Sequence, residues 1–147
     1  MQPRFPEELE HPPRSHPAIE PKEIAAAAAA LAERKKGFDV RIYDVSEHIK
    51  VADYFVLISG ASRPHVKALA DEIHVKLKAR GERHLRAEGT ELGWWVLLDY
   101  VDVVVHVLQP EAREYYDLDG LYRDCPALDR TQVALPDLDA EPARVAE

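Results

Sequence analysis

Apolar positions recur along the middle of the chain with two different periods. Between residues 66 and 77 the apolar side chains lie three and four positions apart. This spacing predicts an amphipathic helix, with Ser62 as its N-cap and Gly81 beyond its end. Apolar and polar residues alternate from 38 to 43, which predicts a half-exposed strand, whereas the unbroken apolar run 54–58 predicts a strand covered on both faces.

The next apolar segments predict a hairpin. The runs 94–98 and 103–108 are separated by the short segment 99–102, which reads as a tight turn between two strands. Residues 83–88 predict a short edge strand before this hairpin, and a short helix is expected to begin at Pro110.

A further helix is predicted near the start of the chain. Pro21 suits its first turn, the alanines 25–30 follow, and Gly37 ends it after about Lys36. The full order is helix, two strands, helix, three strands, helix. This order predicts an α/β (α+β) fold with a mixed five-stranded sheet flanked by helices.

The chain length of 147 residues suits one domain, which we place at residues 21–126. Residues 1–20 hold five of the eleven prolines and have no periodic apolar pattern, so we expect a disordered leader. Residues 127–147 are polar and interrupted by prolines, and we expect an acidic flexible tail there.

Composition and charge indicate the cellular compartment and the kind of partner to expect. Cys125 is the single cysteine and no apolar run approaches the roughly 20 residues of a membrane span, so a cytoplasmic protein without a membrane partner is expected. The net charge is −8, and residues 111–147 carry 4 Arg against 10 Asp or Glu. Such a surface disfavours direct sequence-specific binding of nucleic acid and suits a basic protein partner, or it only aids solubility.

No residue set predicts catalysis, a cofactor or a metal. The segment 59–62 precedes a helix but lacks the glycines and the lysine of a phosphate-binding loop. Asp99 and Asp102 lie at the two ends of the predicted turn, where Asp commonly accepts local hydrogen bonds. Cys125 has no base beside it. His106, inside the last strand, is either a hydrogen-bonded sheet residue or part of a partner site.

Aromatic residues concentrate between residues 93 and 122, where both tryptophans and four of the six tyrosines occur. Trp94 and Trp95 are adjacent, so on a strand they point to opposite faces and one is expected to be exposed. Tyr115 and Tyr116 likewise face different directions on a short helix. Core packing and a partner-binding patch both remain open explanations.

Six segments from 44 to 126 resemble the ribosomal silencing factor family, also called Iojap-like proteins. The resemblance implies a domain with nucleotidyltransferase-like topology but without catalytic carboxylates, and therefore no enzyme. The segments, in family order, are ADYFVLISGAS (52–62), HVKALADEI (65–73), LRAEG (85–89), WVLLDY (95–100), DVVVHV (102–107) and REYYDLDGLY (113–122).

This resemblance also implies a function. Family members bind the large ribosomal subunit through the ribosomal protein numbered fourteen, and they block joining of the small subunit, so the resemblance implies that the chain is a translational repressor. Some members of the family form homodimers. The alternatives are a large-subunit assembly factor and a nucleotide-binding enzyme that uses residues 59–62. The partner-binding residues that the resemblance implies are Trp95, Leu97, Asp99, Tyr100, His106 and Tyr115.

Two positions depart from the family pattern. Val101 stands where the family usually has Gly, so the hairpin turn must avoid a positive φ there or accept strain. Pro64 stands where Arg is common, which leaves Arg63 as the nearby guanidinium and prevents any role of the family Arg from being transferred.

Overall fold

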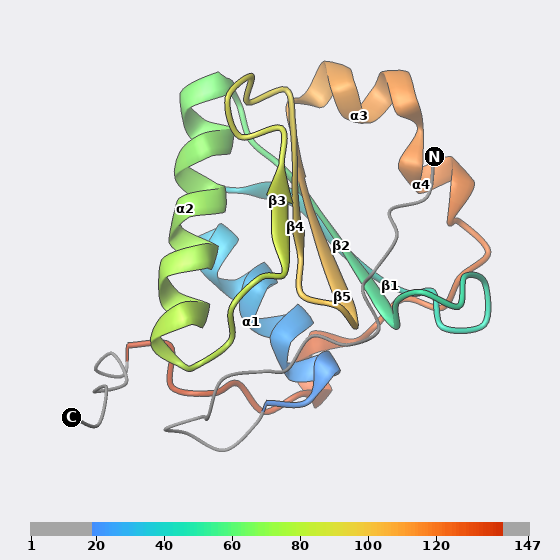
Figure 1. The fold of residues 1–147 in the computed structure, drawn as a ribbon. Coiled ribbons are helices and arrows are strands. Elements are labelled where there is room, and N and C mark those ends of the chain that lie inside the picture. The colour runs from blue at the N-terminus through green and yellow to red at the C-terminus, as the bar shows by residue number, and fades with distance from the viewer. Residues whose placement is uncertain (1–18, 140–147) are drawn as a thin grey trace.

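The computed structural model describes residues 19–139, in which five strands form one sheet with helices on both faces (Figure 1). Strands β2 and β5 are parallel, and all other neighbouring strands are antiparallel, so the predicted mixed sheet is confirmed. β3 covers only half of the predicted edge strand. The sheet order is β1 (Phe38–Asp44), β2 (Tyr54–Ser59), β5 (Val103–Leu108), β4 (Trp95–Asp99) and β3 (Arg86–Glu88).

Two long helices, α1 (Pro21–Arg34) and α2 (Arg63–Ala79), cover one face of the sheet, which we call the closed face (Figure 1). Within residues 19–139 no helix is long and apolar enough to cross a membrane. The predicted N-cap is confirmed, because the Ser62 hydroxyl accepts the His65 amide hydrogen at 3.3 Å. The predicted stripe of α2 is buried throughout, namely Val66, Leu69, Ala70, Ile73 and Leu77.

Helix α1 is covered on every side. Its successive residues Ala25–Ala29 are all buried, and five positions at about 100° each pass right round a helix. The outer side is covered by the C-terminal segment, where Leu138 joins the core and Arg130 forms two hydrogen bonds with Glu33 at 2.6 and 2.9 Å. Residues of the segment 127–139 therefore contact α1, and the flexibility expected of the tail stays a prediction.

The remaining ends lie outside the described residues. The predicted leader 1–20 is described only at Ile19 and Glu20, and the predicted tail is described only to Asp139. Ile19 is buried, and its amide donates to the Glu82 carboxylate at 3.3 Å. This contact ties the start of the described chain to the segment that follows α2.

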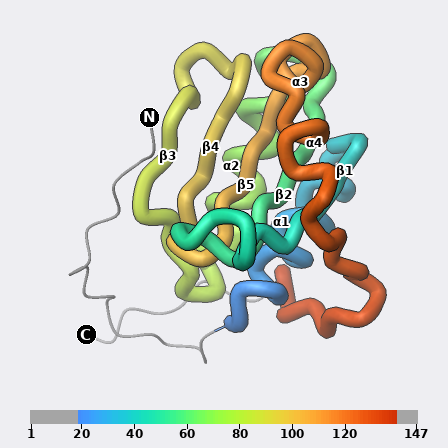
Figure 2. The backbone as a smooth tube through the Cα atoms, turned by 90° about the vertical axis from the view of Figure 1, so that its right-hand side faces the viewer, coloured from blue at the N-terminus to red at the C-terminus, as the bar shows by residue number. Residues whose placement is uncertain are grey.

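The opposite face, which we call the open face, is covered only in part. Short helices α3 (Pro110–Tyr116) and α4 (Leu118–Leu121) lie on this side. The later 3₁₀ turn Arg130–Gln132 lies against α1 instead, where Arg130 binds Glu33. Seen from the open face, α3 and α4 leave β3 and β4 in view, while the loop between β1 and β2 crosses the lower ends of the strands (Figure 2). A second, smaller apolar core lies beneath these elements.

Candidate functional site

The turn between β4 and β5 is held by its own polar groups. The Asp99 carboxylate accepts the Val101 amide hydrogen at 2.8 Å, so the predicted turn role of Asp99 is confirmed. The Asp102 amide donates to the Tyr100 carbonyl at 3.0 Å, which closes a three-residue γ-turn. Val101, at its centre, has a φ of 75°. The chain therefore accepts positive φ at a β-branched residue.

Strand alternation divides the predicted contact residues between two faces. Trp95, Leu97 and Asp99 lie on the open face, and His106 pairs with Leu97 across the β4–β5 ladder and shares that face. Tyr100 belongs instead to the core beneath α2 on the closed face and is only 7% exposed. The structure thus brings the four predicted residues of strands β4 and β5 together and separates Tyr100 from them.

A line of touching aromatic rings runs across the open face. We call the residues Tyr115, Tyr116, Trp95, His106 and Phe55 the aromatic tract. Successive ring centroids along it are 5.0, 4.7, 5.8 and 4.8 Å apart. Tyr115 is 79% exposed and Tyr116 45%, Trp95 is half-buried, and His106 is buried. The tract therefore extends from solvent into the core, as a partner-binding patch does.

His106 is the buried end of the hydrogen-bonded pair in this tract. The Trp95 indole N–H donates to Nδ1 of His106 at 3.0 Å. Because an indole nitrogen can only donate, Nδ1 must be unprotonated. Burial lowers the pKa of His106 to about 4, which agrees with a neutral ring. Nε2 has no hydrogen-bond partner among residues 19–139, so the predicted satisfied histidine is satisfied at one nitrogen only.

A partly buried ion pair holds α3 and α4 against the sheet. Nε and Nη2 of Arg113 bind the Asp119 carboxylate at 2.7 and 3.0 Å, a bidentate arrangement. Nη1 of Arg113 donates to the Ser59 hydroxyl at 2.9 Å and to the Asp39 carbonyl. The Tyr43 hydroxyl donates to Asp119 at 2.8 Å, and burial together with this carboxylate raises the pKa of Tyr43 to about 12. Sequence reasoning missed this network, although both charged residues lie in the REYYDLDGLY segment.

Asp99 supports the open face without being accessible on it. Its side chain is 1% exposed, and burial raises its pKa. Nε of Arg86, on the neighbouring edge strand, lies 3.8 Å from the carboxylate. Asp99 is therefore placed to hold the turn and the β3 edge rather than to contact a partner.

The segment at the start of α2 already uses its polar groups within the chain. A free anion site would need backbone N–H groups directed outward at the helix N-terminus. Here Ser59 Oγ pairs with Arg113 Nη1 at 2.9 Å, Gly60 N with Leu108 O at 2.9 Å, Ala61 N with His65 Nδ1 at 2.8 Å and Ser62 Oγ with His65 N at 3.3 Å.

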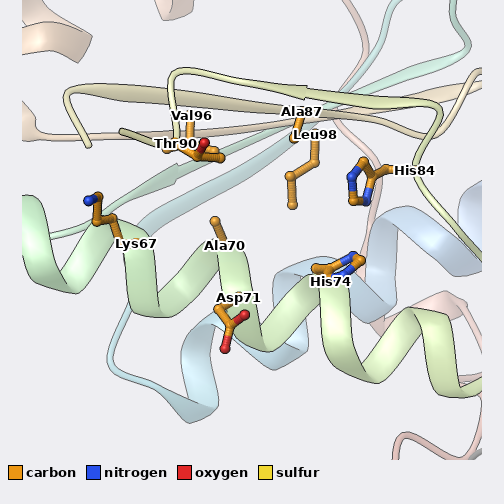
Figure 3. Close-up of a pocket in the computed structure, with 9 residues that line it drawn as sticks. All are labelled: Lys67, Ala70, Asp71, His74, His84, Ala87, Thr90, Val96 and Leu98. Carbon is orange, nitrogen blue, oxygen red and sulfur yellow. The ribbon is translucent and has the colours of Figure 1, made fainter. Parts of the chain in front are cut away.

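A pocket of about 440 Å³ lies on the closed face between α2 and strands β3 and β4 (Figure 3). His74 and His84 lie at one end and Lys67 at the other. The two imidazoles are 4.6 Å apart, edge to face, a pairing that sequence spacing did not indicate. In the described part of the chain no group of three or more His, Cys, Asp or Glu residues could hold a metal. The pocket is also lined by Ala70, Asp71, Ala87, Thr90, Val96 and Leu98.

These features define a mixed α/β domain whose prominent feature is a partly exposed aromatic face. The family model described as "Ribosomal silencing factor during starvation" matches residues 18–146, and the chain belongs to this family. The ribosomal silencing factor RsfS of Chromobacterium violaceum is 40% identical over 104 residues, which cover 71% of this chain and 85% of that protein. RsfS of Bacillus subtilis is 38% identical over 108 residues, which cover 74% of this chain and 92% of that protein.

Solved structures agree with this assignment. A crystal structure of a Chromobacterium violaceum protein has a TM-score of 0.70 and 35% identity, and the match covers 86% of this chain and 98% of that one. A crystal structure of a Bacillus halodurans protein has a TM-score of 0.65 and 31% identity, and the match covers 74% of this chain and 98% of that one. The predicted family and fold class are therefore confirmed.

Proposed function

We propose that this chain is a non-enzymatic translational repressor that docks on the large ribosomal subunit and sterically blocks joining of the small subunit. The observation that carries the proposal is the aromatic tract, in which a half-buried Trp95 lies between His106 and Tyr116 on the open face. Membership of the ribosomal silencing factor family supports it. In this proposal the chain works in the cytoplasm, where ribosomal subunits join.

The proposed partner on the large subunit is the ribosomal protein numbered fourteen. Trp95, Leu97 and Tyr115 are the proposed contacts, because they are the predicted residues with exposed side-chain area. Aromatic anchors of this kind often contribute about 2 kcal/mol or more each to binding. Exposed Glu111 and Glu114 on α3 border the tract and suit a basic partner.

Replacement of Trp95 tests this surface. Trp95→Ala should raise the dissociation constant for purified large subunits about thirtyfold, the equivalent of about 2 kcal/mol, because it removes the central anchor. Co-sedimentation over a concentration series measures the constant. Trp94→Ala is the matched control, since Trp94 is the adjacent tryptophan, is 38% exposed and lies outside the tract. Wild-type affinity in a folded Trp95→Ala variant would reject the docking surface.

Blocking of subunit joining needs its own measurement. Light scattering should show slower formation of joined ribosomes when large subunits are first saturated with the chain, and normal rates with Trp95→Ala at the same concentration. Normal rates despite saturation by the wild-type chain would show that the chain binds large subunits without blocking subunit joining, which contradicts the proposed repression. A homodimer through the open face would compete with docking, and sedimentation equilibrium of the isolated chain reports it.

A role in large-subunit assembly is the second candidate. One relative, from Mus musculus, is named "Mitochondrial assembly of ribosomal large subunit protein 1" and is 29% identical over 96 residues, 63% of this chain and 42% of that protein. An assembly factor predicts that cells lacking the chain accumulate large-subunit precursors on sucrose gradients. A silencing factor predicts mature subunits that join too readily.

A further inference from the structure

His106 was a predicted contact residue, but its burial does not suit direct contact. Its side chain is only 4% exposed, since it lies on the central strand β5 between β2 and β4. The Phe55 ring stands edge-on to it at 4.8 Å on one side, and the Trp95 ring lies at 5.8 Å on the other. A docked protein would therefore touch Trp95 and not the imidazole behind it.

The hydrogen bond between these two rings restricts the tryptophan. A half-buried indole can rotate about two side-chain bonds, and each free rotor lowers affinity when a partner has to immobilise it. Here the indole N–H is directed to Nδ1 of His106 at 3.0 Å, while the Tyr116 ring packs at 4.7 Å. His106 is itself immobilised by the sheet, so the bond fixes Trp95 relative to the backbone of β5.

We propose that His106 is a positioning residue, whose unprotonated Nδ1 holds the Trp95 indole in its docking orientation before a partner arrives. The inference rests on the proposed function, because docking through Trp95 is what the orientation serves. It assigns the binding contact to the indole and the pre-ordering to the imidazole.

A pair of substitutions separates the acceptor from the rest of the ring. His106→Leu keeps a buried apolar side chain but removes the acceptor. His106→Asn places an amide oxygen close to the position of Nδ1 and retains the acceptor. Both are made in the full chain carrying Trp94→Phe, which leaves Trp95 as the single tryptophan. Circular dichroism checks that each variant is folded.

Two measurements then report the role. In the isolated chain, acrylamide quenching of Trp95 fluorescence should increase for His106→Leu and stay near the parent value for His106→Asn. The dissociation constant for large subunits should rise about fivefold for His106→Leu, the equivalent of one net hydrogen bond, and recover for His106→Asn.

The possible failures are distinguishable. Unchanged quenching in a folded His106→Leu variant overturns the positioning role, whatever its affinity for ribosomes. Increased quenching with normal affinity also overturns it, provided that Trp95→Ala binds weakly. If Trp95→Ala also binds normally, the proposed docking surface itself is rejected.

Discussion

The two faces of the sheet are built by different means. The closed face is packed mainly with aliphatic side chains from α1, α2 and the strands, with the Glu82 carboxylate buried beside Ile19, and the middle of α1 is enclosed on every side. The open face buries Asp99, His106 and Arg113, and each of these groups orders a neighbouring segment. The closed face thus supplies stability, whereas the open face uses buried polar groups to present aromatic rings.

This contrast explains why polar groups are buried on the side proposed for binding. An apolar contact is non-directional, so aliphatic packing alone does not fix the orientation of a ring at the surface. A hydrogen bond or a bidentate ion pair fixes both distance and direction. Arg113 anchors the helix that carries Tyr115 and Tyr116, and His106 anchors Trp95.

Matched leucine truncations on the two faces give the largest expected effect. Leu69→Ala removes a side chain of α2 that faces the sheet and is 0% exposed, and it should cost about 4 kcal/mol of unfolding free energy. Leu97→Ala removes a partly buried side chain on the open face and should cost about 1 kcal/mol. Urea denaturation followed by circular dichroism measures both.

The same pair should separate stability from docking. Leu69→Ala should bind large subunits normally under conditions where it stays folded, and Leu97→Ala should bind more weakly. Equal losses of stability for the two variants would contradict the division between the faces.

A pH titration of stability sharpens the comparison at His106. Its pKa is lowered from 6.5 to about 4 by burial, so between these values the unfolded chain binds more protons than the folded one. Its contribution to stability is therefore complete above about pH 6.5 and is lost as pH falls toward 4, by roughly 3 kcal/mol. His106→Leu should lose less stability than wild type over this range.

The control for this titration lies on the closed face. Burial, with help from His74 and Lys78, also lowers the pKa of His84, so His84→Leu should flatten the profile in the same direction. Asp99, on the same face as His106, has a raised pKa and acts in the opposite direction, but it is present in every variant. A His106→Leu profile parallel to that of wild type would show that His106 is not buried as a neutral ring.

Much of the fold could be predicted because the apolar periods were strong. The period of 3.6 in α2 and the unbroken run of β2 survive in the structure as a buried helix stripe and a central strand. The contacts of Arg130 and Leu138 with the core around α1 were not predicted, because the polar composition of this segment resembles that of disordered chains. The successive buried alanines 25–29 were the missed signal, since a helix that is apolar all round needs cover on its outer side.

The site was less predictable than the fold, since it depends on pairings between distant segments. Strand alternation could place Trp95 and Leu97 on one face, yet Tyr100 was assigned to the same patch although it follows Asp99 directly and begins the turn. Arg113 and Asp119 are charged residues on short helices, where sequence alone favours solvent exposure. Only the packing of α3 and α4 on β1 and β2 shows that they are partners.

A substitution of Val101, in the turn that joins β4 and β5, gives the smallest expected effect. Its positive φ costs an L side chain about 1–2 kcal/mol, which a glycine avoids at an entropic cost of roughly 0.5–1 kcal/mol. Val101→Gly should therefore raise the unfolding free energy slightly, by about 0.5 kcal/mol in urea denaturation. Val51→Gly is the control, since Val51 is also a loop valine, is 39% exposed and has no positive φ, and it should lower stability. If both substitutions lower stability equally, the hairpin turn is not strained, and the departure from the family glycine costs this chain nothing.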